Sequence, residues 1–111
     1  MPRKAPVKSV VVICSYRVRR GMEPEFRKLL RKHWTTLDRL QLVAEAPRLV
    51  LRSFGAKSCE IVEIFAWKSG GFEIAHKSPE VLALWEPMEQ MCESRDGRPA
   101  TEFPHFEIVA P

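Results

Sequence analysis

Apolar residues recur with the two-residue period of a β-strand in three segments of the chain, 10–18, 48–54 and 59–67. In the third segment they divide between two faces, with Val62, Ile64 and Ala66 on one and Ile61, Phe65 and Trp67 on the other. A sheet with helices on one side only should have a polar second face. Two apolar faces therefore predict a partner sheet over the second one, and we expect that partner to cover Ile61, Phe65 and Trp67.

Two other segments carry apolar residues at helical spacing. The first helix is predicted to begin near Glu23, because Pro24 and Glu25 suit a first turn, and to run to Leu42. Its apolar stripe consists of Phe26, Leu29, Leu30, His33, Trp34, Leu37 and Leu40. His33 is thus a polar group in a place where we expect little water.

The second helix is predicted to begin at Ser78, a good N-cap, with Pro79 in the first position. Its apolar stripe consists of Val81, Leu84, Trp85, Met88 and Cys92. Pro87 inside the stripe predicts a kink. A short helical turn capped by Ser69 should precede this helix, and a last strand is predicted at 103–109.

The element order β-α-β-β-α-β predicts an α+β, ferredoxin-like fold with a four-stranded antiparallel sheet. We expect residues 9–111 to form a single domain, because a chain of 111 residues that is 45% hydrophobic suffices for one core. Residues 1–8, with two prolines and three basic residues, are expected to form a flexible tail. The cover that the second sheet face needs predicts a homodimer.

The composition narrows the function without naming it. A net charge of +4 is mildly basic, which permits anionic partners but does not require them. No run of residues has the length of a membrane span or of a signal peptide, so we predict a cytoplasmic protein that does not enter a membrane. Cys14, Cys59 and Cys92 form no CxxC pair and no dinucleotide motif is present, so neither a metal nor another cofactor is predicted.

Two stretches of the sequence resemble one known family. They are Glu63-Ile64-Phe65-Ala66-Trp67-Lys68-Ser69 with the following Ala75-His76-Lys77-Ser78-Pro79, and the opening Tyr16-Arg17-Val18 with Gly21-Met22-Glu23. Both are similar to segments of the antibiotic biosynthesis monooxygenase-like family of dimeric α/β barrels. The resemblance implies a dimer whose two sheets close into one barrel, with a pocket between sheet and helices in each subunit. It also implies either oxidation of polycyclic phenols to quinones without metal or flavin, or degradation of haem.

The haem-degrading branch resembles this chain less. Cys14, His76 and Glu86 stand near the positions where that branch has an asparagine, a tryptophan and the iron-binding histidine. The resemblance therefore favours a small planar aromatic ligand, while the identity of that ligand, haem included, stays open.

The candidate catalytic residues are His76, His33 and Tyr16, with His76 first because an imidazole can take a phenol proton near neutral pH. The candidate substrate-binding residues are Trp34, Phe72, Trp85, Met88 and Cys14. Each also has a purely structural interpretation, since a histidine or tryptophan in an apolar stripe is commonly a core residue. Glu60 and Glu63 lie on opposite faces of a strand, so they are not expected to form an acid–base pair.

Two other function classes compete with an enzyme. A domain of this shape can bind a small ligand in a regulatory role without turnover. RNA-recognition domains share the element order, but they carry a glycine and exposed aromatic residues on the third strand. Here that strand has two acids and no glycine, so nucleic-acid binding is not favoured.

Overall fold

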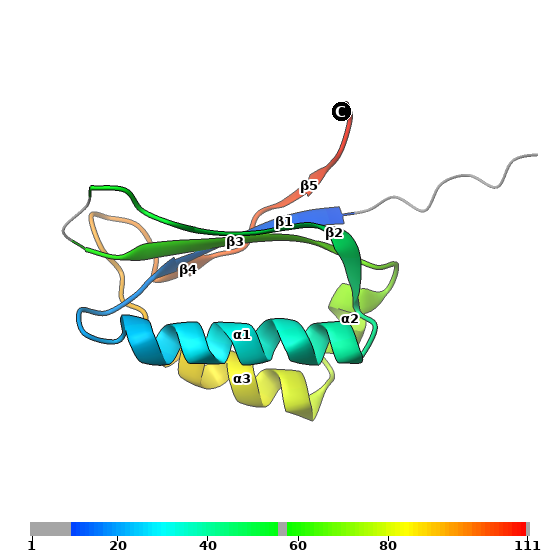
Figure 1. The fold of residues 1–111 in the computed structure, drawn as a ribbon, viewed down its shortest axis with the longest axis horizontal. Coiled ribbons are helices and arrows are strands. Elements are labelled where there is room, and N and C mark those ends of the chain that lie inside the picture. The colour runs from blue at the N-terminus through cyan, green and yellow to red at the C-terminus, as the bar shows by residue number, and fades with distance from the viewer. Residues whose placement is uncertain (1–9, 56–57, 111) are drawn as a thin grey trace, which may run out of the picture.

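A computed structural model describes residues 10–55 and 58–110 of the chain. The strands are β1 (Val10–Arg17), β2 (Val43–Arg52), β3 (Glu60–Trp67), β4 (Thr101–Glu102) and β5 (His105–Glu107), and the helices are α1 (Glu23–Arg39), α2 (Gly71–Ala75) and α3 (Pro79–Gln90). This order confirms the predicted α+β, ferredoxin-like class (Figure 1). The flexible tail predicted at 1–8 lies outside the described residues.

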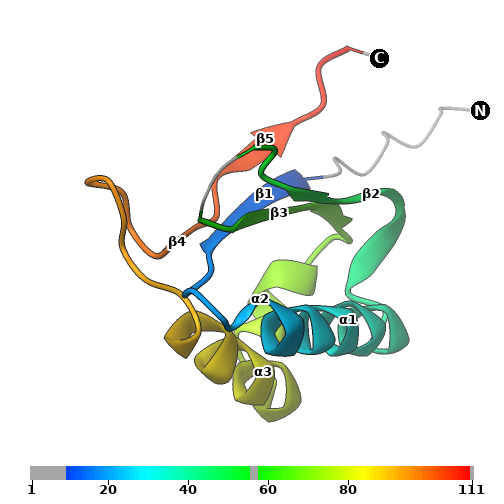
Figure 2. The same ribbon diagram turned by 60° about the vertical axis from the view of Figure 1, so that its left-hand side comes forward.

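The sheet is antiparallel and runs in the order β2-β3-β1-β4, with β5 also paired to β1. All three helices lie on one side of it, and in Figure 2 no helix or strand of the described residues covers the opposite face, which we call the bare face. Among the described residues, no helix combines the length and the apolar composition that crossing a membrane requires.

The register of β1 against β3 sets which side chains face the helices. Cys14 lies opposite Glu63 and Tyr16 lies opposite Ile61, and directly opposed residues share a face. This inner face holds most of the buried sheet residues, namely Val12, Cys14, Tyr16, Ile61, Glu63, Phe65 and Trp67. Glu63, a carboxylate on this face, is completely buried.

The prediction that a partner covers Ile61, Phe65 and Trp67 is wrong, because the protein's own helices cover that face. The bare face is the alternate one, and it is apolar too. Its residues include Ile13, Leu49, Leu51, Val62, Ile64 and Phe106. Leu49, Leu51 and Phe106 are each about half exposed, so an apolar sheet face still needs a cover, but it is this face and not the predicted one.

Helix α1 ends three residues before the predicted Leu42. Gln41 takes a left-handed conformation with φ 58°, and the Leu42 amide donates to the Leu37 carbonyl at 3.0 Å. The Gln41 amide donates to Asp38 at 2.9 Å, which completes a Schellman-type end. The sequence did not indicate this helix end, because the left-handed residue that ends a helix is usually glycine and here it is Gln41.

Strand β2 begins at Val43 rather than at the predicted position 48, and a register shift separates Val43 from Arg48. Pro47 falls inside that shift, on an edge strand, where a missing amide does little harm. Of the last strand predicted at 103–109 only β5 (His105–Glu107) forms; β4 (Thr101–Glu102) precedes it, and Phe103-Pro104 separate the two. Pro104 still accepts a hydrogen bond of 3.0 Å from the Ile13 amide, so both pieces follow β1.

The caps of the two short helices differ. Ser78 caps α3 as predicted, and its hydroxyl accepts from the Val81 amide at 3.3 Å. Ser69 does not cap α2; the N-cap is Gly70, with φ 77°, a conformation that serine rarely adopts. Helix α3 continues through Pro87 to Gln90.

Candidate functional site

A cavity of about 530 Å³ lies between the inner face of the sheet and the helices. Strand residues Val12, Cys14 and Tyr16 line one side of it, and Trp85 and Met88 of α3 line another. The lining is predominantly apolar, with a few polar groups at defined positions, which is the usual character of a small-molecule site.

Six aromatic side chains form a closed ring of contacts around this cavity, and all six line it. The ring centroids follow one another at 5.0 Å for Phe65–Trp67, 5.8 Å for Trp67–Phe72, 4.3 Å for Phe72–His76, 4.9 Å for His76–Trp85, 6.3 Å for Trp85–His33 and 6.3 Å for His33–Phe65. The interplanar angles lie between 53° and 74°, so these contacts are tilted or edge-to-face. Such a ring presents both faces and edges to a planar ligand.

The indole N–H of Trp67 is an unused donor in this ring. It is buried and has no hydrogen-bond partner within the part of the chain that the structure describes. Buried polar groups are nearly always paired, and Trp67 lines the cavity. An acceptor oxygen on a ligand would satisfy it.

The floor of the cavity is formed by a polar network centred on Glu63. The Tyr16 hydroxyl donates to Glu63 Oε1 at 3.2 Å, and His33 Nδ1 lies 3.4 Å from the same oxygen. Arg48 Nη2 approaches Glu63 Oε2 at 3.5 Å. A carboxylate that is completely buried requires such partners, because its desolvation is otherwise too costly. Glu63 itself does not line the cavity, and it reaches the cavity only through Tyr16 and His33.

The hydrogen bond that His33 Nε2 accepts indicates which nitrogen of the ring carries the proton. Trp85 Nε1 donates to His33 Nε2 at 2.9 Å, and an indole N–H can only donate. Nε2 therefore carries no proton, and the neutral imidazole holds its proton on Nδ1, which faces Glu63. Nε2 of His33 is thus hydrogen-bonded, whereas Nδ1 lies 3.4 Å from Glu63 Oε1 and makes no hydrogen bond among the described residues.

His76 lies at the solvent-exposed rim, as the C-cap residue of α2. Its imidazole packs edge-to-face against Phe72 and Trp85. Phe72 is 37% exposed and contacts His105 at 5.1 Å, so the rim is open to solvent. His76 is thus a titratable group at the mouth, and Tyr16, 3% exposed, is a hydroxyl at the floor.

Burial and the charge of Glu63 raise the pKa of two acidic groups on the cavity floor. Burial first, and the Glu63 carboxylate second, raise the pKa of the Tyr16 hydroxyl well above its ordinary value. The same two causes raise the pKa of the Cys14 thiol. Neither group ionises near neutral pH, so Cys14 serves as part of the cavity wall and Tyr16 keeps its hydroxyl proton.

Seven of the residues that the sequence singled out line this one cavity, namely Cys14, Tyr16, His33, Phe72, His76, Trp85 and Met88. Trp34 does not line it. Its ring is covered by the Arg48 guanidinium at 4.4 Å and packs edge-to-face on Phe65. The structure thus places Trp34 behind the network, where it holds Arg48.

Sequence reasoning missed Glu63, Phe103 and His105. Glu63 was weighed only as a partner of Glu60, although a lone acid between the apolar Ile61 and Phe65 was itself a signal of a buried carboxylate. Phe103 lies between β4 and β5, and His105 is the first residue of β5. Both line the rim of the cavity, and no local sequence pattern relates this segment to the cavity.

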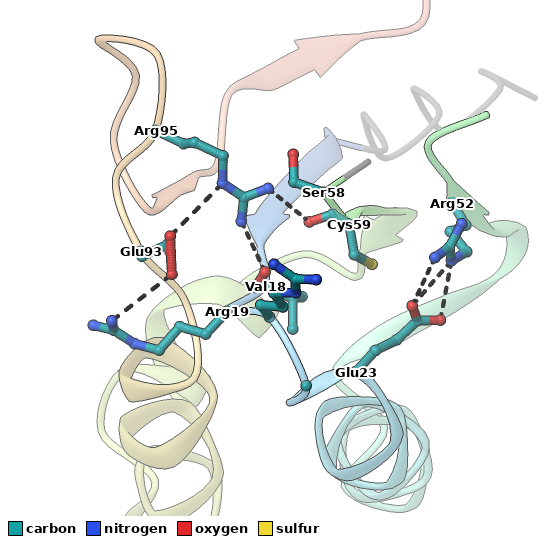
Figure 3. Close-up of a pocket in the computed structure, with 10 residues that line it drawn as sticks. Val18, Arg19, Glu23, Arg52, Ser58, Cys59, Glu93 and Arg95 are labelled. Atoms are coloured by element: carbon teal, nitrogen blue, oxygen red, sulfur yellow. Dashed lines mark hydrogen bonds and ion pairs between the residues drawn. The ribbon is translucent and has the colours of Figure 1, made fainter. Parts of the chain in front are cut away.

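A second cavity, of about 650 Å³, lies beside the turn after β1 and contains four arginines and two glutamates (Figure 3). Its charges are already paired in large part. Arg52 contacts Glu23 at 3.0 Å, and Arg95 donates to the Val18 carbonyl at 2.8 Å. The first contact ties β2 to α1, and the second ties the segment after α3 to Val18, directly after β1. Among the described residues, no three His, Cys, Asp or Glu side chains are grouped as a metal site requires.

No protein-family model matches the sequence, and no curated protein is similar to it. Solved structures do share the fold. A mutant of SnoaB, a cofactor-independent oxygenase from Streptomyces nogalater, has a TM-score of 0.74 at 16% identity over 93% of this chain and 95% of that one. An antibiotic biosynthesis monooxygenase-like protein from Nitrosomonas europaea has 0.73 at 11% identity over 98% of each chain.

A NIPSNAP-family protein of unknown function from Agrobacterium tumefaciens has a TM-score of 0.64 at 16% identity over 96% of each chain. These matches confirm the resemblance to antibiotic biosynthesis monooxygenase-like proteins at the level of the fold. At such identities they carry the fold alone, and the chemistry has to be argued from the cavity.

Proposed function

We propose that this protein is a cofactor-independent oxygenase that converts a planar phenol into a quinone. The observation that carries the proposal is the aromatic ring around the cavity, with the Tyr16 hydroxyl on the floor and the His76 imidazole at the rim. The fold neighbour SnoaB, a cofactor-independent oxygenase, supports the same reaction class. The unpaired Trp67 donor suits a ligand that has an acceptor oxygen.

The reaction requires two proton transfers at opposite ends of the substrate ring. A phenol and dioxygen yield a para-quinone and water. The phenol O–H loses its proton as one electron passes to dioxygen, and the superoxide and phenoxyl radical then combine at the para carbon. The distal peroxide oxygen takes up the proton that the phenol lost. The para carbon then gives its C–H proton to a base while the O–O bond breaks and hydroxide leaves, and the base passes that proton to the hydroxide, which becomes water.

Two groups of the cavity fit these steps. Tyr16 on the floor can accept a hydrogen bond from the phenol hydroxyl, since its own proton points to Glu63. His76 at the rim can act as the general base for the C–H proton, because its imidazole is exposed and exchanges protons with solvent. Trp85, Phe72 and Met88 would then hold the substrate plane between them, with Cys14 in the wall.

A homodimer, acting in the cytoplasm, belongs to the same proposal. The bare sheet face presents the half-exposed Leu49, Leu51 and Phe106, and an apolar face of this kind gains stability when a second copy covers it. Two sheets packed through these faces would leave each aromatic cavity on the outer, helical side.

A ligand-binding module without turnover is the second candidate. One observation favours it: Nε2 of the buried His33 already accepts a hydrogen bond from Trp85, so its lone pair is not free to act as a base.

Oxygen uptake separates the two candidates. The protein is incubated aerobically with di- and trihydroxy-aromatic compounds, and oxygen consumption and the quinone absorbance are followed together. An oxygenase consumes one dioxygen per quinone formed, and the variant Tyr16→Phe lowers the rate. Ligand binding, seen by quenching of tryptophan fluorescence, with no oxygen uptake for any compound would favour the binding module.

A further inference from the structure

We propose that Glu63 accepts the substrate's phenolic proton and returns it when water forms, and that Tyr16 passes the proton between substrate and Glu63. The inference rests on the proposed function, and it assigns a role to a buried carboxylate that the pocket itself does not expose. The first step is the position of Glu63 on β3, two residues before Phe65, which lines the cavity. It lies directly opposite Cys14 across the β1–β3 pairing, with both of its oxygens in contact with donors.

Tyr16 is the link between Glu63 and the cavity. Its side chain lines the cavity, and its hydroxyl donates to Glu63 Oε1 at 3.2 Å. The lone pairs of the hydroxyl oxygen remain to accept a hydrogen bond from a ligand. A substrate phenol, Tyr16 and Glu63 can therefore form one continuous chain of hydrogen bonds.

Tyr16 cannot be the base on its own. Burial and the neighbouring Glu63 charge hold the pKa of its hydroxyl well above the ordinary value, so a tyrosinate does not form near neutral pH. The hydroxyl can still take one proton while it gives up another. The carboxylate behind it then supplies the proton affinity.

The transfer balances in atoms and electrons. As one electron leaves the phenol for dioxygen, the phenol O–H bond breaks and its proton bonds to the Tyr16 oxygen. The original Tyr16 O–H bond breaks and that proton bonds to Glu63 Oε1. The products are a phenoxyl radical, superoxide, an unchanged Tyr16 and a protonated Glu63. Glu63 loses its negative charge as dioxygen gains one, so the net charge of the whole site does not change.

His33 and Arg48 are positioning residues in this account. The His33 Nδ1–H faces the same oxygen that Tyr16 uses, and Trp85 fixes the tautomer from the far side. Arg48 approaches the second oxygen of Glu63 while its guanidinium is stacked on Trp34. Three groups thus hold the carboxylate, while only the Tyr16 contact leads into the cavity.

The test uses 4-nitrophenol as a probe whose absorbance reports its own ionisation. With the probe bound, titration of the wild-type protein should show nitrophenol ionising at higher pH than it does in the Glu63→Gln variant, by one pKa unit or more, because the Glu63 charge disfavours a second anion in the chain. The matched control is Glu73→Gln, an exposed acid of α2 for which the wild-type titration is expected.

Turnover of a dihydroxy-aromatic substrate is measured on the same variants. Glu63→Gln and Tyr16→Phe should each lower kcat by about 10²- to 10⁴-fold, the span for loss of a proton acceptor, and Glu73→Gln should not. If Glu63→Gln does not fold, Tyr16→Phe carries the test, because it leaves Glu63 with His33 and Arg48.

The outcomes separate this inference from the proposed function. Turnover within about threefold of wild type in both variants would overturn the relay and leave the oxygenase standing. A shifted nitrophenol titration with no oxygen uptake from any phenol would support the contact between Glu63 and the ligand and overturn the oxygenase. A protein that binds no phenol would overturn both.

Discussion

The Trp85 indole donates a hydrogen bond of 2.9 Å to Nε2 of His33 and thereby fixes which nitrogen of that histidine carries the proton. The same bond joins α3 to α1 directly above the cavity. His33 is 2% exposed, so neither nitrogen can turn to water for a partner. A single contact between two helices therefore keeps Nδ1–H directed at the carboxylate beneath it.

Trp85→Phe tests this relationship. The substitution keeps an aromatic ring but removes the donor, so His33 Nε2 is left buried without a partner. We expect a loss of about 1–3 kcal/mol in the free energy of unfolding, measured by urea denaturation, because an orphaned buried acceptor costs that much. Trp34→Phe is the matched control, since the Trp34 ring contacts are to Arg48 and Phe65. Equal losses in the two variants would mean that ring volume, not the hydrogen bond, matters.

His76→Ala should lower turnover by about two to four orders of magnitude, the usual consequence of losing a general base, and should leave the dimer intact. Steady-state oxygen uptake and sedimentation measure the two. His105→Ala serves as the comparison, because His105 packs on the same Phe72 at the rim. A similar fall in both variants would indicate a damaged wall, and unchanged turnover in His76→Ala with a loss in His33→Ala would transfer the role to His33.

The thiols should react slowly. Burial, as the leading cause, raises the pKa of the Cys59 and Cys92 thiols to about 11, and it raises that of Cys14 further. Because the thiolate is the reactive form, only about one thiol in a thousand is reactive at pH 8. Modification by Ellman's reagent should therefore be slow in the native protein, should accelerate as the pH rises toward 11, and should become fast for all three in denaturant. Rapid native modification of any cysteine would contradict the prediction.

Gly71→Ala should destabilise the rim. A Cβ at Gly71 would lie 2.2 Å from the Leu42 carbonyl oxygen, and that oxygen already accepts from the Lys68 amide at 2.9 Å. Alanine normally favours a helix over glycine, so the clash has to outweigh that gain; we expect a net loss of about 1–3 kcal/mol, the cost of forced backbone shifts. Thermal unfolding measures it, with Glu73→Ala as the exposed control in the same helix. A stabilised Gly71→Ala would show that α2 is free to move away from Leu42.

Local patterns predicted the element order and half of the cavity lining, because alternation and helical spacing bring residues such as Tyr16, His33 and Trp85 to the faces that meet. They did not predict which sheet face the helices cover, since both faces are apolar and only the three-dimensional path decides. They also left Glu63 unassigned. Its partners Tyr16, His33 and Arg48 lie 47, 30 and 15 positions away along the chain, and no short-range rule relates them.

The helix end at Gln41 and the division at Pro104 illustrate two kinds of boundary. Pro104 carried a readable signal, because a proline cannot donate to the sheet. Gln41 carried none, since its left-handed conformation is imposed by the hydrogen bonds that close α1 on Leu37 and Asp38. The end of a helix or strand can be predicted where a residue type such as proline causes it, but not where hydrogen bonds among residues of ordinary type cause it.

Leu51→Glu should convert the proposed homodimer into a monomer. Leu51 lies on the bare sheet face opposite Val62, is 47% exposed in one subunit, and is flanked on that face by Leu49 and Ile64. A carboxylate there would have to be buried against the partner's apolar sheet, where it would lack a counter-ion, and that cost exceeds the gain from the contact. Sedimentation at micromolar concentration should show wild type at twice the 12.8 kDa chain mass and Leu51→Glu at that mass.

The matched control is Leu82→Glu, which introduces the same charge at a 42% exposed leucine of α3, on the helical side of the molecule. It should remain dimeric, because a partner on the bare sheet face does not reach that side. A dimer broken by Leu82→Glu and not by Leu51→Glu would mean that the subunits meet through their helices. A wild-type protein that sediments as a single chain would leave the apolar face without the proposed cover, and the barrel with it.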